Sequence, residues 1–317
     1  MPRFSLIILV AFELSYYLLI VQTGIVEYYS SNIYLLATLP LGGIIGSIFS
    51  SFIKEKKRDI LSFFIFLQLL ISLFYPNISQ QLLFVLGVSA GVISVLMIDL
   101  LKKLKPFEIG VALSISYTIG TLLFNYDVSL RGDLAVLLSV VVLVGSRFLP
   151  KEDIHREDSY RHSIVVMLIW VLLDATLFET LSRDTVISIW RDGFSLEIVF
   201  FHIVGVVLAL SLKLSNRVNE SVILLLFIMS YFLYYLKLAY LLSAIYPIAI
   251  SYYNIVILQT ILKKDLKTIA IYMLFIAWVS SGLGLFMALN GLAFYETILF
   301  FFLVFTIFKS KKGSINV

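Results

Sequence analysis

Residues 81–101 read QLLFVLGVSAGVISVLMIDLL, and Lys102 and Lys103 follow directly. An α-helix needs about 20 mostly apolar residues to cross the hydrocarbon core of a bilayer. Asp99 is the one charged residue in this run, and it stands near the end of the run beside the lysines. The stretch therefore predicts a membrane-spanning helix.

The composition of the whole chain agrees with this stretch. The chain has 317 residues, of which 61% are hydrophobic and 14% are charged, whereas soluble domains are roughly 45–50% apolar and about 25% charged. These values exclude a soluble enzyme, a nucleic-acid binder and a secreted disulfide scaffold. The chain has no cysteine, which also excludes disulfides, thiolate catalysis and a cysteine metal site.

Twelve apolar runs of this kind follow one another along the sequence, so we predict an all-α integral membrane fold with twelve transmembrane helices. The runs are 4–24, 32–53, 59–75, 81–101, 108–125, 133–149, 163–182, 195–214, 220–236, 239–262, 267–289 and 292–309. A polar stretch, KEDIHREDSYR at 151–161, separates the sixth run from the seventh. The predicted domains are an N-terminal six-helix bundle (1–149), a cytoplasmic linker (150–162) and a C-terminal six-helix bundle (163–317).

The lysines and arginines predict the orientation. With the N-terminus in the cytoplasm, all but four of the 24 basic residues fall in cytoplasmic segments. The four exceptions are Arg131, Arg183, Arg191 and Lys237. Membrane proteins keep basic residues on the cytoplasmic side, so both termini are predicted to be cytoplasmic. The protein is expected in the plasma membrane or a bacterial inner membrane.

The two halves resemble each other in sequence. One shift of register places Leu101, Lys102 and Lys103 on Leu262, Lys263 and Lys264, and the same shift places Glu13 on Asp174. Each half has six spans and so enters the membrane in the same direction. The halves are therefore expected to be parallel repeats, as in many transporters.

Twelve spans in a six-plus-six arrangement, with cytoplasmic termini and a charged linker, resemble the major facilitator superfamily of secondary transporters. The family's motif between helices 2 and 3 is present in part. Gly46 and the basic cluster 54–58 match it, while the Asp-Arg pair and the second Gly are absent. The family often has an acid at the inner end of helix 4, where Asp99 stands. The resemblance implies a gate in which Asp99 pairs with Arg58 or a neighbouring lysine.

Two acids stand halfway along predicted spans, Glu13 in the first and Asp174 in the seventh. An ionisable group at this depth is costly and often functional. The resemblance implies that both helices line a central cavity, where a carboxyl can bind a cation or carry a proton. The alternative is a hydrogen-bonded acid that only joins two helices.

Aromatic residues lie one helical turn from these acids: Tyr17 after Glu13, Phe178 after Asp174 and Trp170 before it. Aromatic faces attract organic cations, although tyrosine and phenylalanine are frequent throughout this chain. Asn254 follows Pro247, whose kink can open backbone carbonyls to a cavity. We count these residues as candidate proton or substrate sites.

The remaining polar and small residues predict structure. Gly42, Gly43 and Gly46 in the second span and Gly87 and Gly91 in the fourth should let helices approach closely. His202 is expected to pack or hydrogen-bond, and His162 is expected to be solvated in the linker. No metal site and no cofactor are predicted.

The leading hypothesis is a secondary active transporter that works by alternating access and is coupled to protons. Acids without bases at mid-span favour a small cationic or neutral solute. We slightly favour efflux of an organic cation, with uptake of a neutral nutrient or a metal as the alternative, because no sequence feature indicates the direction. The expected partners are that solute, protons and the lipid bilayer, without nucleic acid, and the protein is expected to be a monomer. We do not expect an enzyme. The alternatives are a polytopic enzyme acting on lipid through the connection 182–192, and a degenerate transporter that acts as a receptor or assembly factor.

Overall fold

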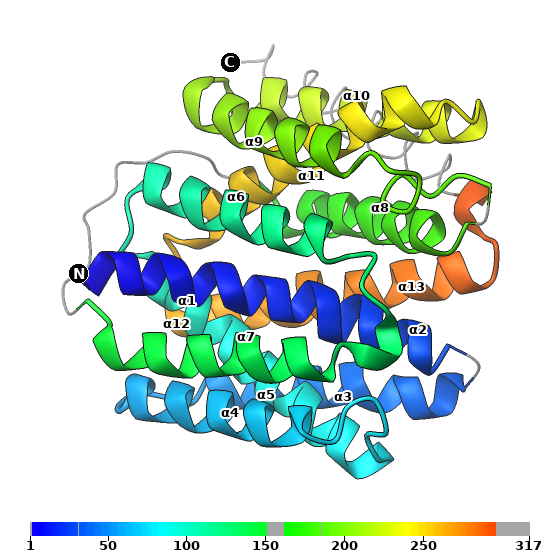
Figure 1. Cartoon of the computed structure of the whole chain (residues 1–317). Coiled ribbons are helices and arrows are strands. Elements are labelled where there is room, and N and C mark those ends of the chain that lie inside the picture. The colour runs from blue at the N-terminus through cyan, green and yellow to red at the C-terminus, as the bar shows by residue number, and fades with distance from the viewer. Residues whose placement is uncertain (1, 31, 151–161, 185, 296–317) are drawn as a thin grey trace. The chain divides into compact units, whose positions relative to one another are not determined.

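The computed structural model describes residues 2–30, 32–150, 162–184 and 186–295, and these residues form helices and connections without a strand (Figure 1). The α-helices are α1 (Pro2–Tyr16), α2 (Val26–Tyr28), α3 (Ile33–Ser50), α4 (Lys57–Ser72), α5 (Gln80–Leu101), α6 (Pro106–Leu122), α7 (Gly132–Gly145), α8 (Ile164–Arg183), α9 (Ser195–Ser211), α10 (Asn216–Tyr235), α11 (Ala239–Ile261), α12 (Leu266–Met273) and α13 (Ser281–Leu289). Two π-helical segments, Tyr17–Ile25 and Leu274–Ser280, join α1 to α2 and α12 to α13.

The predicted apolar runs correspond to these helices. Each run up to residue 289 coincides with one helix or with a continuous series of helices. Among the described residues, six helical stretches are long and apolar enough to cross a membrane: Pro2–Tyr28, Gln80–Leu101, Ile164–Arg183, Asn216–Tyr235, Ala239–Ile261 and Leu266–Leu289. The chain is therefore an all-helical, multi-pass membrane protein. Most of the run 292–309 and the C-terminus lie outside the described residues, so twelve spans and the positions of the termini stay predictions.

The chain divides into two compact units. One holds residues 1–157 with 261–278, and the other holds 158–260 with 279–317. The predicted boundaries, 149 and 163, assign all of 267–289 to the second bundle, whereas the structure divides this stretch within its π-helical segment. The reason is that α12 packs against α3 and α5. The linker residues 151–161 lie outside the described part of the chain.

In the first unit, α3 and α5 pack backbone against backbone through glycines. A Cβ atom on Gly42 or Gly46 would lie 2.1 or 2.2 Å from a carbonyl oxygen of α5. A Cβ on Gly87 or Gly91 would lie 2.1 or 2.3 Å from a carbonyl oxygen of α3. The contact therefore has no room for a side chain on either helix, as the small residues of these two spans predicted.

Gly43 gives α3 a second close contact, with the indole ring of Trp278. A Cβ on Gly43 would lie 2.2 Å from an indole carbon. The same indole meets the ring of Tyr17 edge to face, with 6.2 Å between ring centroids. Tyr17 begins one π-helical segment and Trp278 belongs to the other, so the two wide helical turns of this unit meet at these rings.

Also in the first unit, α1 lies beside α6 and α7, while α4 packs on α5 and α7 (Figure 1). Arg131, which comes just before α7, is only 1% exposed although it was expected in an outer connection. Its guanidinium donates to backbone and side-chain oxygens of two neighbouring segments. The acceptors include the Leu19 carbonyl at 2.8 Å, Thr23 Oγ1 at 2.8 Å, the Phe124 carbonyl at 2.6 Å and the Tyr126 carbonyl at 3.0 Å. Arg131 thus holds the π-helical turn of the first span.

The second unit is centred on α8, which packs against α13 and α10. Gly284 allows the close approach of α13, since a Cβ there would lie 2.6 Å from the Cβ of Ala175. The α9 helix is joined to α11 by a 2.7 Å hydrogen bond between His202 Nδ1 and Ser251 Oγ. His202 therefore has the hydrogen-bonding role that its lone position in the sequence predicted.

Candidate functional site

Asp174 lies halfway along α8, and both of its carboxylate oxygens accept hydrogen bonds from tyrosines of α11. The Tyr253 hydroxyl donates to Oδ2 at 2.5 Å, and the Tyr246 hydroxyl donates to Oδ1 at 2.9 Å. Tyr246 also donates to the Asp174 carbonyl at 3.0 Å. The two tyrosines are seven residues apart, which is two helical turns, so they present their rings on one face of α11.

The donors to the Asp174 carboxylate are neutral phenols. Within the described part of the chain, no lysine, arginine or histidine forms an ion pair with it. Each carboxylate oxygen that accepts one hydrogen bond still has a lone pair available. Asp174 is half-buried, so it can accept a further partner, and the phenols favour its charged form.

Further aromatic rings extend from the two tyrosines that bind this carboxylate. Phe178 meets Trp190 with ring centroids 4.9 Å apart, and Trp190 meets Tyr246 at 6.0 Å. Phe227 packs on Tyr253 at 5.5 Å. All five rings are buried. We call Asp174 with these five residues the Asp174 cluster; the sequence had indicated only Phe178 among the rings.

Two other predicted members lie elsewhere. Trp170 is fully buried, and its ring contacts the ring of His162 at 5.2 Å between centroids. Trp170, one helical turn before Asp174 on α8, therefore contacts a different set of residues from Asp174. Asn254 is half-buried, and among the described residues the hydrogen bonds of the Asp174 carboxylate go to Tyr246 and Tyr253 rather than to Asn254.

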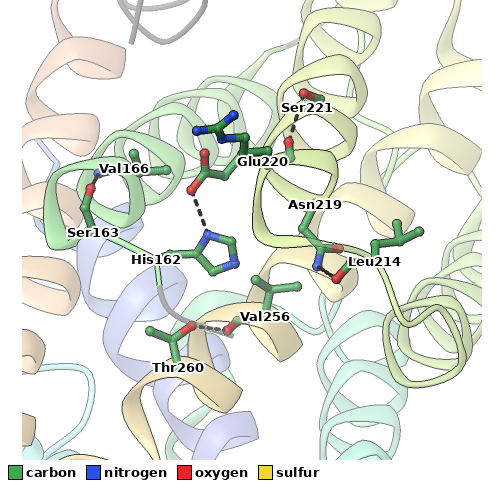
Figure 2. A network of polar contacts seen from close by, with 10 residues as sticks. His162, Ser163, Val166, Leu214, Asn219, Glu220, Ser221, Val256 and Thr260 are labelled. Atoms are coloured by element: carbon green, nitrogen blue, oxygen red, sulfur yellow. Dashed lines mark hydrogen bonds and ion pairs between the residues drawn. The ribbon is translucent and has the colours of Figure 1, made fainter. Parts of the chain in front are cut away.

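His162, expected to be solvated, has a fully buried ring. Figure 2 shows this ring pointing to Glu220, with Nδ1 2.9 Å from Glu220 Oε1. The next residue, Ser163, caps α8 by accepting a hydrogen bond from the Val166 N–H at 3.3 Å (Figure 2). The prediction that His162 is solvated was wrong. It was based on the charged residues that precede His162 in the chain, and these do not determine where the His162 ring itself points. The pair ties the start of α8 to α10.

Glu13, the counterpart of Asp174 in the sequence repeat, has a different environment. It is 5% exposed, and its Oε2 accepts a hydrogen bond from Gln68 Nε2 of α4 at 3.0 Å. Tyr17 was predicted to share its helical face, but Tyr17 begins the π-helical segment and contacts Trp278. The two acids therefore do not have equivalent partners in the two halves.

Asp99, at the end of α5, is held by two lysines. Its Oδ2 lies 2.6 Å from Lys57 Nζ and its Oδ1 lies 2.6 Å from Lys102 Nζ. Arg58 does not contact Asp99; it donates to the backbone carbonyls of Ser146 and Arg147. Consecutive residues of a helix point about 100° apart, so Lys57 faces α5 while Arg58 faces the end of α7.

A further acid lies in the connection between α11 and α12. Asp265 caps α12, accepting a hydrogen bond from the Thr268 N–H at 3.2 Å. Hydrogen bonds from Thr268, together with the charge of Lys102, hold the pKa of the Asp265 carboxyl below its usual range. The ends of α5 and α12 therefore share an ionised cluster of both signs.

We expect Asp99→Asn to raise the reactivity of a cysteine introduced at Ser50, a fully buried position in the last turn of α3, several-fold. The substitution removes the charge that joins α4 to α5, so the helix ends separate more often. The measurement is the labelling rate with a membrane-impermeant maleimide, in a chain that has no other cysteine.

Glu55→Gln, at an exposed acid in the connection between α3 and α4, is the matched control and should leave the labelling rate unchanged. An unchanged rate in Asp99→Asn would mean that the ion pairs are surface contacts, which contribute only tenths of a kcal/mol.

The connection after α8 uses its charged residues for its own structure. Arg183 Nη2 lies 2.7 Å from Glu179 Oε2. Asp184 Oδ1 accepts hydrogen bonds from the backbone of Val186 and Ile187. In addition, no group of three or more His, Asp or Glu residues that could hold a metal ion occurs among the residues that the structure describes.

The chain resembles known transporters in structure. One is the human organic anion transporter MFSD10 (TETRAN), with a TM-score of 0.57 and 12% identity over 96% of this chain and 98% of that one. Another is a bacterial homologue of the iron transporter ferroportin in an outward-facing state, with a TM-score of 0.53 and 12% identity over 97% of this chain and 96% of that one. Comparison of the sequence with protein-family models and with curated proteins found no match. The likeness shows that the chain shares its overall fold with these two proteins.

The Tyr246 and Tyr253 hydroxyls are the partners that the sequence did not identify. A signal was present, because two tyrosines seven residues apart in one span place two polar groups on one helical face. The sequence does not show, however, which side of α11 faces α8.

Proposed function

We propose that the chain is a secondary active transporter in which two six-helix halves give alternating access to a solute site. In this proposal the chain has twelve spans with both termini in the cytoplasm, and it acts as a monomer. Its fold, shared with known transporters, supports this reading. The observation that carries it is the Asp174 carboxylate, placed halfway along an apolar helix and hydrogen-bonded by neutral phenols.

The chemistry of the Asp174 cluster favours a positively charged partner. The two phenols stabilise the carboxylate form of Asp174 by hydrogen bonding, and this form attracts a cation or a proton. The rings of Tyr246 and Tyr253 at the carboxylate can add cation–π attraction, which is strongest where water is excluded. An anionic solute would meet the charge of Asp174 without a basic residue to offset it. We therefore propose a small organic cation as the solute, with a neutral solute or a metal as the alternative.

Energy would come from a proton gradient, because a carboxyl halfway along a span can take up a proton on one side of the membrane and release it on the other. In this scheme the solute leaves the cell as protons enter. The organic anion and iron named for the structural relatives are substrates of those proteins. The Asp174 cluster argues against the first kind of substrate here.

The test uses purified protein in liposomes with an imposed pH gradient and tetraphenylphosphonium as the probe cation. Asp174→Asn should lower gradient-driven flux by about tenfold or more, since removing one partner of a buried charged contact costs about 2–5 kcal/mol. Asp133→Asn, at an exposed acid, is the control and should leave the flux unchanged.

Solute exchange without a gradient then defines the role of Asp174. Exchange that survives Asp174→Asn assigns the proton to this residue, and exchange that is lost assigns the cation. Normal driven flux in Asp174→Asn would overturn the proposal and leave Asp174 as a contact between α8 and α11.

Two other functions make different predictions. A lipid enzyme would need free reactive groups in the connection 182–192, where Arg183 and Asp184 are engaged in local contacts. A receptor or assembly factor would bind its ligand but carry no flux into liposomes. Flux of the probe through wild-type protein, above the passive flux measured in protein-free liposomes, excludes both.

A further inference from the structure

Glu13 and Gln68 form a buried pair that the proposed cation site does not use. Glu13 is 5% exposed and Gln68 is fully buried. Gln68 Nε2 donates to Glu13 Oε2 at 3.0 Å, so the partner of this carboxyl is neutral. Within the described residues the Oε1 atom of Gln68 is buried and has no hydrogen-bond partner. The pair thus contains an acceptor that lacks a donor.

Within the described residues, no ion pair joins Glu13 to a charged group of a neighbouring element. The titratable and charged groups of the elements packed on α1 are Asp133 at the exposed start of α7, Arg147 just after α7, Glu108 and Tyr117 of α6, Asp99 of α5, and Lys57, Arg58 and Asp59 at the start of α4. Arg3, on α1 itself, lies 3.9 Å from Glu108. Asp99 is paired with lysines, and Glu108 accepts from the Lys105 N–H at 2.6 Å. On α1 itself, Tyr16 shares a hydrogen bond of 2.9 Å with Ser72 Oγ. A proton is therefore the simplest way to neutralise Glu13.

The side-chain amide of Gln68 can hydrogen-bond to Glu13 whether the Glu13 carboxyl is ionised or protonated. Its N–H donates to the carboxylate, as the structure shows. A protonated carboxyl instead carries an O–H donor, and the amide oxygen can accept it after a half-turn about the last side-chain bond. Because the amide nitrogen and oxygen occupy nearly the same positions after such a turn, the exchange needs no movement of α1 or α4. Protonation of Glu13 supplies the donor that Gln68 Oε1 lacks.

The Asp174 cluster differs from this pair in two ways. Within the described residues, none of its buried polar side-chain atoms lacks a hydrogen-bond partner, whereas Gln68 Oε1 does. Asp174 is also half-buried, with room for a further partner, whereas Glu13 is 5% exposed. A proton fits the closed Glu13–Gln68 pair, and a larger cation fits the more open Asp174 cluster.

We propose that Glu13 is the site that takes up and releases the coupling proton, that Gln68 is the positioning residue that hydrogen-bonds both protonation states, and that Asp174 is reserved for the cationic solute. In the step itself the O–H bond of Glu13 breaks, the proton passes to water, and the electron pair stays on the carboxylate. This division of roles rests on the proposed transport function.

The first test needs no solute. Infrared difference spectra of the purified protein, taken between acidic and alkaline pH, should show a pH-dependent carboxylic acid band that is absent in Glu13→Gln. In Gln68→Leu the band should remain but shift in frequency, because the acid loses its hydrogen-bond partner. Ser72→Ala, one turn along α4, is the matched control and should leave the band in place. A band that persists in Glu13→Gln, or one that Gln68→Leu leaves unshifted, would overturn the proposal.

The second test uses tetraphenylphosphonium in liposomes. Glu13→Gln should abolish gradient-driven accumulation and retain exchange, whereas Asp174→Asn should abolish both. Loss of exchange in Glu13→Gln, or retention of exchange in Asp174→Asn, would contradict the division of roles. Absence of flux in the wild type would contradict the transport function, and the infrared result would still decide whether Glu13 exchanges a proton beside Gln68.

Discussion

Gly87→Leu is expected to prevent the first unit from folding. A Cβ at this position would lie 2.1 Å from the Leu39 carbonyl oxygen and 3.0 Å from the Gly43 nitrogen. Both are backbone atoms, so the clash is relieved only by moving α3 away from α5. In a bilayer the association of helices depends on close packing, because lipid tails are as apolar as the side chains. We expect a loss of about 3 kcal/mol or more, which is the upper range for overpacking a core.

The measurement is the yield of monodisperse protein after detergent extraction, together with its midpoint of thermal unfolding. Gly282→Leu is the matched control, since nothing lies within 4 Å of a Cβ built on Gly282, and it should behave as wild type. Gly87→Ala adds only the Cβ and should fall between the two. A normal yield and midpoint in Gly87→Leu would show that α3 and α5 do not approach as closely as described.

Arg131→Met is expected to destabilise the first unit by about 3 kcal/mol or more. The guanidinium is 1% exposed and donates to oxygens of the first span and of the connection before α7. Methionine fills much of the volume but leaves those acceptors without donors, and each buried unsatisfied group costs about 1–3 kcal/mol. Arg131→Lys should recover only part of the loss, because an ammonium cannot match the planar, five-donor guanidinium.

Unfolding in mixed micelles of rising denaturing-detergent content gives the free energy of unfolding for each variant. Arg147→Met, at an exposed arginine beyond α7, controls for the loss of a positive charge and should change this free energy little. Equal stability of Arg131→Met and Arg147→Met would show that the buried guanidinium does not hold the first span.

The helices of this fold could be predicted because length and apolarity decide whether a segment enters a bilayer. The run 81–101 corresponds to Gln80–Leu101, and the glycines of the second and fourth spans lie at the helix contact as expected. The π-helical segments could not be predicted, since the wider turn arises from contacts that a linear pattern does not contain. The division of 267–289 between the two units could not be predicted either, because it depends on how α12 packs on α3 and α5.

The candidate site was predicted in part. The acids Glu13 and Asp174 were visible because charge in an apolar run is rare. Their partners Gln68, Tyr246 and Tyr253 were not, because their roles depend on which helix faces which. His162 shows a limit of sequence analysis. Its neighbours in the chain are charged, which suggested solvent, but its ring turns inward to Glu220.

The absence of a basic partner at the two mid-span acids also bears on how transport would respond to voltage. Neither Glu13 nor Asp174 forms an ion pair with a cationic side chain in the described structure. In the proposed cycle a proton neutralises Glu13 and a cation neutralises Asp174, so exchange of one proton for one monovalent cation would move no net charge. The membrane potential would then neither drive nor oppose it. A divalent solute exchanged for one proton would make the cycle electrogenic, and the potential would then contribute about 2.3 kcal/mol for each elementary charge and each 100 mV.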